Sequence, residues 1–274
     1  MRIHPEPAAL IALTPFWTGP RFASGRPRVP HEVLNRLRVA TTEQAWDVLR
    51  AEGYPRQFAG GWLQTHPGTV LVGRAVTSMF LPHRPDLDQV VVDAGAHEGH
   101  TAGDRQNSWI IDGLTEDDVM VTDIFGKVEN GTVIGDNLGT AIASRTRRGA
   151  VIDGGIRDLA GLTQLEGVNF FCRGTDPTAI LDVTLAGINL PVRVGQATVL
   201  PGDIVLGTPT GVTFIPAQLA GKVADVAEDI AVRDIFGKAR LAEQVYGSAD
   251  IDTSPWAPDI ENDFQQWRLA RLSS

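Results

Sequence analysis

The hydrophobic and polar positions of the chain switch between two periods in its middle third. Short apolar runs rich in β-branched residues stand at 69–81, 117–126, 131–136, 150–154 and 168–174. Two of the intervening stretches have helical spacing, one at 138–147 that ends before Gly149 and one at 156–167. Strands that alternate with short helices are typical of an α/β domain with parallel strand pairing.

The pattern changes on either side of this segment. Residues 190–216 carry Pro-Gly and Thr-Gly turns between apolar runs and predict antiparallel strands. Residues 30–53 predict two short helices, of which the second is capped by Thr41 or Thr42 and ended by Gly53. The polar stretch 82–106 predicts a long loop with a short strand at 90–92. From residue 217 onward the spacing is helical, with a short last helix at 264–272.

We therefore expect one compact α/β domain, residues 31–216, between two extensions. Residues 1–30 are rich in proline and glycine and predict an arm that wraps a neighbour or a subunit. Residues 217–274 predict a helical C-terminal extension. The chain shows neither an internal repeat nor a low-complexity tract.

Composition and charge limit the classes of partner and the cellular location that we expect. A net charge of −9 argues against nucleic acid or an anionic membrane surface as the main partner, although one local arginine can still hold a small anion. No apolar run approaches the ~18 residues of a membrane span. The N-terminus also lacks the basic start and unbroken apolar core of a signal peptide. With Cys172 as the one cysteine, an internal disulfide is impossible, and we expect a cytoplasmic protein.

The first candidate for chemistry is the turn Gly135-Asp136-Asn137-Leu138, where a predicted strand gives way to a predicted helix. The first amides of a helix have no acceptor within the helix, and the helix dipole favours negative charge there. A glycine lets a ligand approach the backbone, so this turn is suited to a carboxylate. The alternative is that Asp136 or Asn137 simply caps the helix.

The second candidate is Arg157-Asp158, just after the turn Gly154-Gly155 that follows a buried strand. Ligands of open α/β folds bind at the carboxyl ends of strands, and two successive strand ends lie side by side. A guanidinium can hold one carboxylate by two hydrogen bonds, and an aspartate offers the hard oxygen that Mg²⁺ or Mn²⁺ prefers. The alternative is a surface ion pair, usually worth under ~1 kcal/mol.

The segment 135–159, "GDNLGTAIASRTRRGAVIDGGIRDL", resembles the motif of the family of 4-hydroxy-4-methyl-2-oxoglutarate aldolases and the regulator of ribonuclease activity A. The stretches "ATTEQAWDVLRAEG", "VLVGRAVT", "NFFCRGTDP" and "VLPGDIV" resemble further parts of that family, so the resemblance covers roughly residues 31–245. It implies a compact RraA-like β/β/α domain with a mixed sheet and parallel βα units in its centre. It also implies homotrimers or homohexamers, with the extension 217–274 at a subunit interface.

The resemblance also implies roles for particular residues. The backbone amides of 135–138 would bind the carboxylate of pyruvate, and Arg157 would bind the keto acid and polarise its carbonyl oxygen. Asp158 would ligate Mg²⁺ or Mn²⁺, which Asp136 touches through water. A carboxylate from the C-terminal helix of a neighbouring subunit completes the outer shell in the family. Asp234, shorter than the usual glutamate, stands at that place here.

The expected reaction is metal-dependent cleavage of a 4-hydroxy-2-oxo acid to release pyruvate, decarboxylation of oxaloacetate, or both. Cleavage beside a 2-oxo acid leaves an enolate, which either a lysine Schiff base or a metal ion with an arginine can stabilise. The three lysines, Lys127, Lys222 and Lys238, lie in polar surroundings, so the metal route is preferred. A non-catalytic binding protein, or another metal-enolate reaction on a sugar acid, are the alternatives.

The resemblance does not account for the stretch 82–112. The stretch 82–112 is longer than the family norm and holds His97 and His100, three residues apart, with Asp93, Glu98 and Asp104 nearby. The pair indicates a zinc site, a mobile loop or a lid with substrate contacts.

Asp153 and Asp203 are expected in turns, and Trp62, Trp109, Trp256 and Trp267 as packing anchors. Gly207-Thr208-Pro209 stands where many family members carry an acidic residue.

Overall fold

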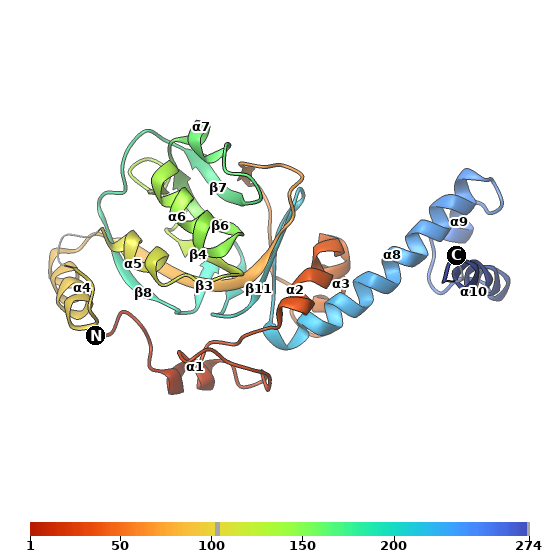
Figure 1. Cartoon of the computed structure of the whole chain (residues 1–274), viewed down its shortest axis with the longest axis horizontal. Helices are drawn as coiled ribbons and strands as arrows, with labels where there is room; N and C mark the ends of the chain where they lie inside the picture. Colours follow the sequence, from red (N-terminus) through yellow and green to blue (C-terminus); the bar gives the residue numbers. More distant parts are fainter. Residues whose placement is uncertain (102–104, 273–274) are drawn as a thin grey trace.

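The computed structural model describes residues 1–101 and 105–272 of the chain (Figure 1). The strands are β1 Phe58–Ala59, β2 Leu63–Gln64, β3 Leu71–Pro82, β4 Asp118–Asp123, β5 Thr132–Ile134, β6 Gly149–Ile156, β7 Asn169–Thr175, β8 Val183–Ile188, β9 Val192–Val194, β10 Ala197–Val199, β11 Ile204–Thr208 and β12 Gly211–Ile215. The α-helices are α1 Pro7–Leu13, α2 His31–Arg36, α3 Thr42–Ala51, α4 Pro85–His97, α5 Gln106–Asp112, α6 Asp136–Thr146, α7 Leu159–Leu162, α8 Ala220–Ala242, α9 Ser248–Ile251 and α10 Pro258–Leu272. Two 3₁₀ turns complete the set: η1 Leu37–Val39 between α2 and α3, and η2 Ala217–Leu219 directly before α8.

The main sheet is mixed, in the order β1-β12-β11-β3-β4-β6-β7-β2, with β5 beside β6 and β8 beside β3. Its centre is parallel: β3 pairs with β4, β4 with β6, and β6 with β5 and β7. The strands after residue 190 form the antiparallel pairs β9–β10 and β11–β12. The expected α/β fold, with parallel units in the centre of a mixed sheet and a helical C-terminal region, is confirmed.

The central strands are buried on both faces, which explains why their sequences are nearly continuous apolar runs. In β4, Met120 belongs to the core on the side of α4, α5 and α6, whereas Val119 and Val121 belong to the core under the β9–β10 hairpin. In β6, Ala150 and Val151 divide between the two cores in the same way. This two-sided burial holds the carboxyl ends of β5 and β6 in fixed positions.

Residues 82–106 contain a helix, so the interpretation as a loop with a strand at 90–92 was wrong. α4 begins at Pro85, a residue suited to a first helical turn. Val91 is buried at 0% exposure, and Gly95 leaves room for the ring of Trp109, which an added Cβ would meet at 2.5 Å. The β-branched run favoured a strand locally, but burial of one helical face against the body decided the structure.

Two other elements differ in extent from the prediction. The helix expected at 156–167 is one turn, α7. It begins only at Leu159, because β6 continues to Ile156 and Asp158 adopts the left-handed conformation, with φ 55° and ψ 40°. The last helix, α10, begins at Pro258 and not near residue 264.

The two aspartates expected in turns differ from each other. Asp153 lies inside β6, where its carboxylate accepts a hydrogen bond from Nε of Arg173 at 2.6 Å, so its placement in a turn was wrong. Asp203 does occupy the turn before β11 and accepts the Leu200 N–H at 2.8 Å, as expected.

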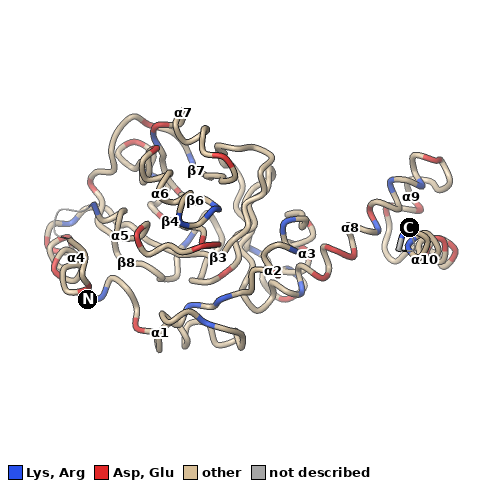
Figure 2. The backbone as a smooth tube through the Cα atoms, viewed as in Figure 1, with Lys and Arg blue, Asp and Glu red and all other residues tan. Residues whose placement is uncertain are grey.

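The first 30 residues pack along the body of their own chain. Ile3 and Val29 are buried, and the guanidinium of Arg26 donates to the buried carboxylate of Asp118 at 2.7 Å. At the other end, α8 leaves the body and α10 packs against its far part (Figure 1). Positively and negatively charged residues both lie along α8 and α10 (Figure 2).

The tryptophans act as packing anchors, as predicted. Trp109 is 4% exposed, and Trp62 packs edge-on against Phe171. Trp256 and Trp267 pack against Phe236 and its neighbours between α8 and α10. Within the described ranges, no helix is both long and apolar enough to cross a membrane.

Candidate active site

The two glycine-containing loops meet at the carboxyl ends of β5 and β6. These strands are parallel, with Ile134 opposite Ile156, and the Arg157 N–H donates to the Ile134 carbonyl at 3.0 Å. The residue after each strand therefore opens into one shared space. A pocket of about 250 Å³ lies there, and its lining includes Gly135, Asp136, Asn137, Leu138, Arg157 and Asp158.

The start of α6 faces this pocket with backbone groups. Its N-cap is Gly135, which offers no side-chain cap. Asp136 is the first helical residue, and its Oδ1 accepts the N–H of Asn137 at 2.7 Å. The conventional cap suggested as the alternative for Asp136 or Asn137 is thus absent. The helix end keeps its partial positive charge, which favours an anion, although the Asn137 N–H is already donated to Asp136.

Arg157 and Asp158 form a loose pair at the mouth of the pocket. Nε of Arg157 lies 3.4 Å from Oδ2 of Asp158, and the two side chains are 42% and 45% exposed. A pair that exposed contributes little to stability, so both groups are available to a ligand. The left-handed backbone of Asp158, at φ 55°, is uncommon outside glycine, and such conformations cluster at functional sites.

Small residues let these groups approach one another. A Cβ on Gly135 would lie 2.3 Å from Oδ2 of Asp158 and 3.1 Å from Nε of Arg157. A Cβ on Gly161 would lie 2.7 Å from the Cβ of Asp136. The glycines therefore bring the α6 start and the β6–α7 loop together more closely than other residues would permit.

The oxygen donors fit a hard divalent cation only with additional ligands. Asp136 and Asp158 do not belong to any group of three His, Cys, Asp or Glu ligand atoms within 4.8 Å of one another in the described part of the chain. Mg²⁺ commonly binds through one or two carboxylates while it keeps several waters and a substrate oxygen. The donor set suits that mode of binding and does not resemble an enclosed protein cage.

The structure adds a pocket residue that the sequence did not single out. Asn107, at the start of α5, is 3% exposed, lines the pocket and donates to the Val133 carbonyl at 2.6 Å. Its Oδ1 is buried with no hydrogen-bond partner, so a ligand donor could satisfy it. Arg105 lines the same pocket. The apolar helical spacing of "NSWII" was the available signal, hidden by the expectation of a loop there.

Asp234 does not approach this pocket within one chain. It lies on α8, which extends away from the body (Figure 1), and its exposed carboxylate faces Nζ of Lys238 at 3.4 Å. Two of the three lysines match the polar surroundings expected of them, since Lys222 pairs with Glu52 and Lys238 with Asp234.

His97 and His100 do not act as a pair. His97 is exposed and hydrogen-bonds to the Asp93 carbonyl at 2.6 Å, whereas His100 stacks on Trp109 at a centroid distance of 4.7 Å. Asp104, grouped with them in the sequence, lies outside the described residues. The structure therefore does not support a zinc site formed by His97 together with His100.

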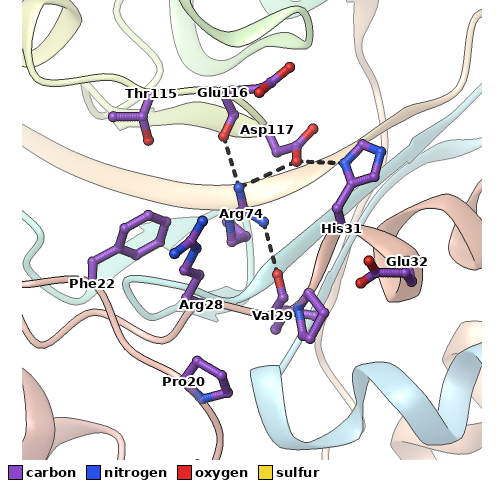
Figure 3. A pocket seen from close by; sticks show the side chains of 11 residues that line it. Pro20, Phe22, Arg28, Val29, His31, Glu32, Arg74, Thr115, Glu116 and Asp117 are labelled. Atoms are coloured by element: carbon purple, nitrogen blue, oxygen red, sulfur yellow. Dashed lines mark hydrogen bonds and ion pairs between the residues drawn. The ribbon is translucent and has the colours of Figure 1, made fainter.

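A larger cavity, of about 750 Å³, lies at the opposite end of β3 and β4 (Figure 3). It is lined by the N-terminal arm, the start of α2, Arg74 of β3 and the loop before β4. There Asp117 pairs with His31 at 2.8 Å and with Arg148 at 2.6 Å, and Arg74 donates to the Val29 carbonyl at 2.8 Å. Burial raises the pKa of Asp117, but the hydrogen bonds from His31 and Arg148 outweigh it and lower the pKa overall. These charges compensate one another and tie the arm to the sheet, so the smaller pocket is the better candidate.

Comparison with known proteins identifies the family of the chain. The model of the RraA-like family, described as Aldolase/RraA, matches residues 42–214. Over 101 residues the chain is 36% identical to a putative 4-hydroxy-4-methyl-2-oxoglutarate aldolase of Halalkalibacterium halodurans. That match covers 36% of this chain and 46% of the relative, less than half of the relative's length.

Two solved structures share the fold at low identity. RraAS2 of Streptomyces coelicolor, an unusual member of the RNase ES inhibitor RraA family, superposes with a TM-score of 0.64 at 24% identity, covering 78% of this chain and 98% of its own. An uncharacterized protein from Pseudomonas syringae pv. tomato gives 0.65 at 21% identity, covering 83% and 94%. With the family model matching well over half of its length, the chain belongs to the RraA-like family, which includes aldolases and non-catalytic regulators.

Proposed function

We propose that the pocket at the ends of β5 and β6 binds a 2-oxo acid and catalyses divalent-metal-dependent cleavage that releases pyruvate. The observation that carries this proposal is the convergence of the α6 amides, Arg157 and Asp158 on one small pocket. The putative aldolase among the relatives supports the same reaction class.

Each group has a role that its position supports. The amides of 135–138, at the positive end of α6, would hold the substrate carboxylate. Arg157 would donate to the keto oxygen and stabilise the negative charge that builds on it as the carbon–carbon bond breaks. Asp158 would hold Mg²⁺ or Mn²⁺, which supplies positive charge beside the same oxygen. Asp136 would orient a water molecule, and a carboxylate-held water would carry the proton.

The same groups serve two closely related reactions. Retro-aldol cleavage of a 4-hydroxy-2-oxo acid and decarboxylation of oxaloacetate both leave the enolate of pyruvate. We propose that the protein performs one or both of them. The group attached to the pyruvate unit would extend toward Arg105 and Asn107, at the side of the pocket formed by α5.

The test is pyruvate release from oxaloacetate and from 4-hydroxy-4-methyl-2-oxoglutarate, with Mg²⁺, with Mn²⁺ and with EDTA. We expect release that EDTA abolishes and added metal restores. Asp158→Ala should lose it, whereas Asp112→Ala, a change in an exposed ion pair with Arg145, should keep it. Release no greater than that of metal alone on both substrates would contradict the lyase.

The second candidate is a non-catalytic regulator, because the chain shares its fold with an RNase ES inhibitor family member. A regulator does not need an arginine and a carboxylate held half-exposed at a helix start, so the pocket favours the enzyme. If no pyruvate is released from either substrate, the regulator or another metal-enolate reaction on a sugar acid becomes the better proposal.

We further propose a homotrimer or homohexamer in which α8 of one subunit brings Asp234 to the pocket of the next. The exposed apolar side chains of Ile235 (52%), Val245 (52%) and Leu269 (65%) on the α8–α10 arm support a covering partner. Mixing Asp158→Ala with Asp234→Ala subunits should then restore part of the activity that each lacks. No recovery on mixing would place Asp234 outside the site.

A further inference from the structure

A second cluster of possible metal ligands lies where the N-terminal arm meets the end of α4 (Figure 1). Nδ1 of His4 lies 2.9 Å from Oε2 of Glu98. One ligand atom from each of His4, Glu98 and His100 lies within 4.8 Å of the others, and all three residues are half-buried. Among the described residues, no other group of three or more His, Cys, Asp or Glu side chains is close enough to hold one ion.

The backbone at residues 98–100 brings the side chains of Glu98 and His100 close to that of His4. Gly99 stands between Glu98 and His100 with φ +89°, a left-handed turn that directs both neighbours to the same side. His100 stacks on Trp109 at 4.7 Å and on His4 at 5.6 Å between ring centroids. The imidazole of His100 thus lies between Trp109 of α5 and His4 of the N-terminal arm.

Glu98 already anchors the arm as a carboxylate. Its oxygens accept the backbone N–H of Ile3 at 2.7 Å and of His4 at 3.0 Å. These two hydrogen bonds fix the carboxylate of Glu98 against the arm, beside the imidazole of His4.

The donor set identifies the class of ion. Two imidazole nitrogens and one carboxylate, with water in the fourth position, are a ligand set typical of Zn²⁺, whereas Mg²⁺ and Ca²⁺ prefer oxygen alone. Ligand atoms around a tetrahedral zinc lie about 3.3 Å apart, given Zn–N and Zn–O distances near 2 Å. His4 and Glu98 are already within that separation, at 2.9 Å. To bind the ion, His100 has to turn its ring out of the stack with Trp109 and His4 so that a ring nitrogen faces the ion.

We propose that His4, Glu98 and His100 form a site for Zn²⁺ that fastens the N-terminal arm to the end of α4. The site is independent of the proposed active-site metal, since it uses none of the residues at the ends of β5 and β6. A surface cavity of about 460 Å³, lined by Met1, Arg2 and Glu98 among others, gives the ion access from solvent.

The experiment is titration of the metal-free full chain with Zn²⁺ by calorimetry, together with thermal unfolding with and without Zn²⁺. It is run on the wild type, on His4→Ala, on His100→Ala and on His97→Ala. The Asp158→Ala variant serves to exclude binding at the active-site metal position. His97 is the matched control because it lies three residues from His100 and outside the cluster.

We expect one Zn²⁺ bound, with a rise in the unfolding midpoint, in the wild type, in His97→Ala and in Asp158→Ala. His4→Ala and His100→Ala should each weaken binding by at least about tenfold and lose the rise in midpoint. Because His100 also packs on Trp109, His4→Ala serves as the test if His100→Ala unfolds.

Absence of Zn²⁺ binding by the wild type would leave the cluster an ion pair that holds the arm and would overturn the proposal. Equal losses in His97→Ala, or unchanged affinity in His4→Ala, would also overturn it. Loss of the binding in Asp158→Ala would place the ion at the ends of β5 and β6 instead.

Discussion

Gly135 is the position where one added methyl group tests the candidate active site most directly. Its φ of −121° and ψ of −165° are open to any residue, so alanine adds no backbone strain. Space is the constraint, because a Cβ there would lie 2.3 Å from Oδ2 of Asp158, whereas ordinary contacts begin at 3.4 Å. In Gly135→Ala the carboxylate of Asp158 must therefore retreat by about 1 Å.

The expected cost falls on catalysis more than on folding. A displacement of about 1 Å in a reacting group costs on the order of 10²-fold in rate, or about 2.7 kcal/mol of transition-state stabilisation. We therefore expect kcat/KM for pyruvate release to fall about 100-fold, and Mn²⁺ binding to weaken. Asp158 is 45% exposed and can move into solvent, so the free energy of unfolding should change by less than about 1 kcal/mol.

The assay couples pyruvate release to lactate dehydrogenase, beside calorimetric Mn²⁺ titration and urea unfolding. Gly221→Ala is the matched control, since a Cβ on this second residue of α8 meets nothing within 4 Å and should leave activity intact. A Gly135→Ala variant that keeps more than half of the wild-type kcat/KM and Mn²⁺ affinity would show that the contact with Asp158 does not set the geometry of the site. A loss of activity only in proportion to lost stability would show the same.

Two further predictions concern buried charges. Burial raises the pKa of Asp203 to about 7, against 3.8 for an unperturbed carboxyl, so the stability this group contributes is complete below about pH 4 and is lost as the pH rises toward 7. One pKa unit corresponds to about 1.4 kcal/mol. Between pH 4 and pH 7.5 the free energy of unfolding of Asp203→Asn, measured in urea, should therefore rise relative to that of the wild type by on the order of 4 kcal/mol. If the two free energies change in parallel with pH, the carboxyl is not buried in its neutral form. Arg26→Met should cost about 3–5 kcal/mol, because it leaves the carboxylate of Asp118, whose side chain is 0% exposed, without its ion-pair partner and with hydrogen bonds from Thr115 alone among the described residues. Arg145→Met, in a half-exposed pair, should cost under about 1 kcal/mol by the same measurement, and equal losses would contradict the role of burial.

Local patterns predicted most of the central fold. The apolar runs at β3, β4, β6 and β7 and the helical spacing of α6 were readable because both faces of a parallel sheet are buried and helices repeat every 3.6 residues. The turns after residue 190 were readable because Pro-Gly and Thr-Gly sequences favour antiparallel connections. These features depend on neighbours along the chain, and they recur in the structure with small shifts at their ends.

The elements that were misjudged depend on contacts that no local pattern records. The run at 90–92 favours a strand by itself, and only the face that α4 buries against Trp109 makes it a helix. The late start of α7, at Leu159, follows from the left-handed conformation of Asp158, which spacing does not reveal.

For the candidate active site, local sequence is enough to supply the residue types: a glycine-led helix start, an arginine and an aspartate after two neighbouring strands. Tertiary structure alone decided that these groups share one pocket, because pairing of Ile134 with Ile156 and the missing Cβ of Gly135 set their separation. It also added Asn107 from α5 to the pocket, and it placed His4 beside Glu98, 94 residues away in sequence. Proximity between distant segments arises from packing of the whole chain, and so it is decided only when the fold is complete.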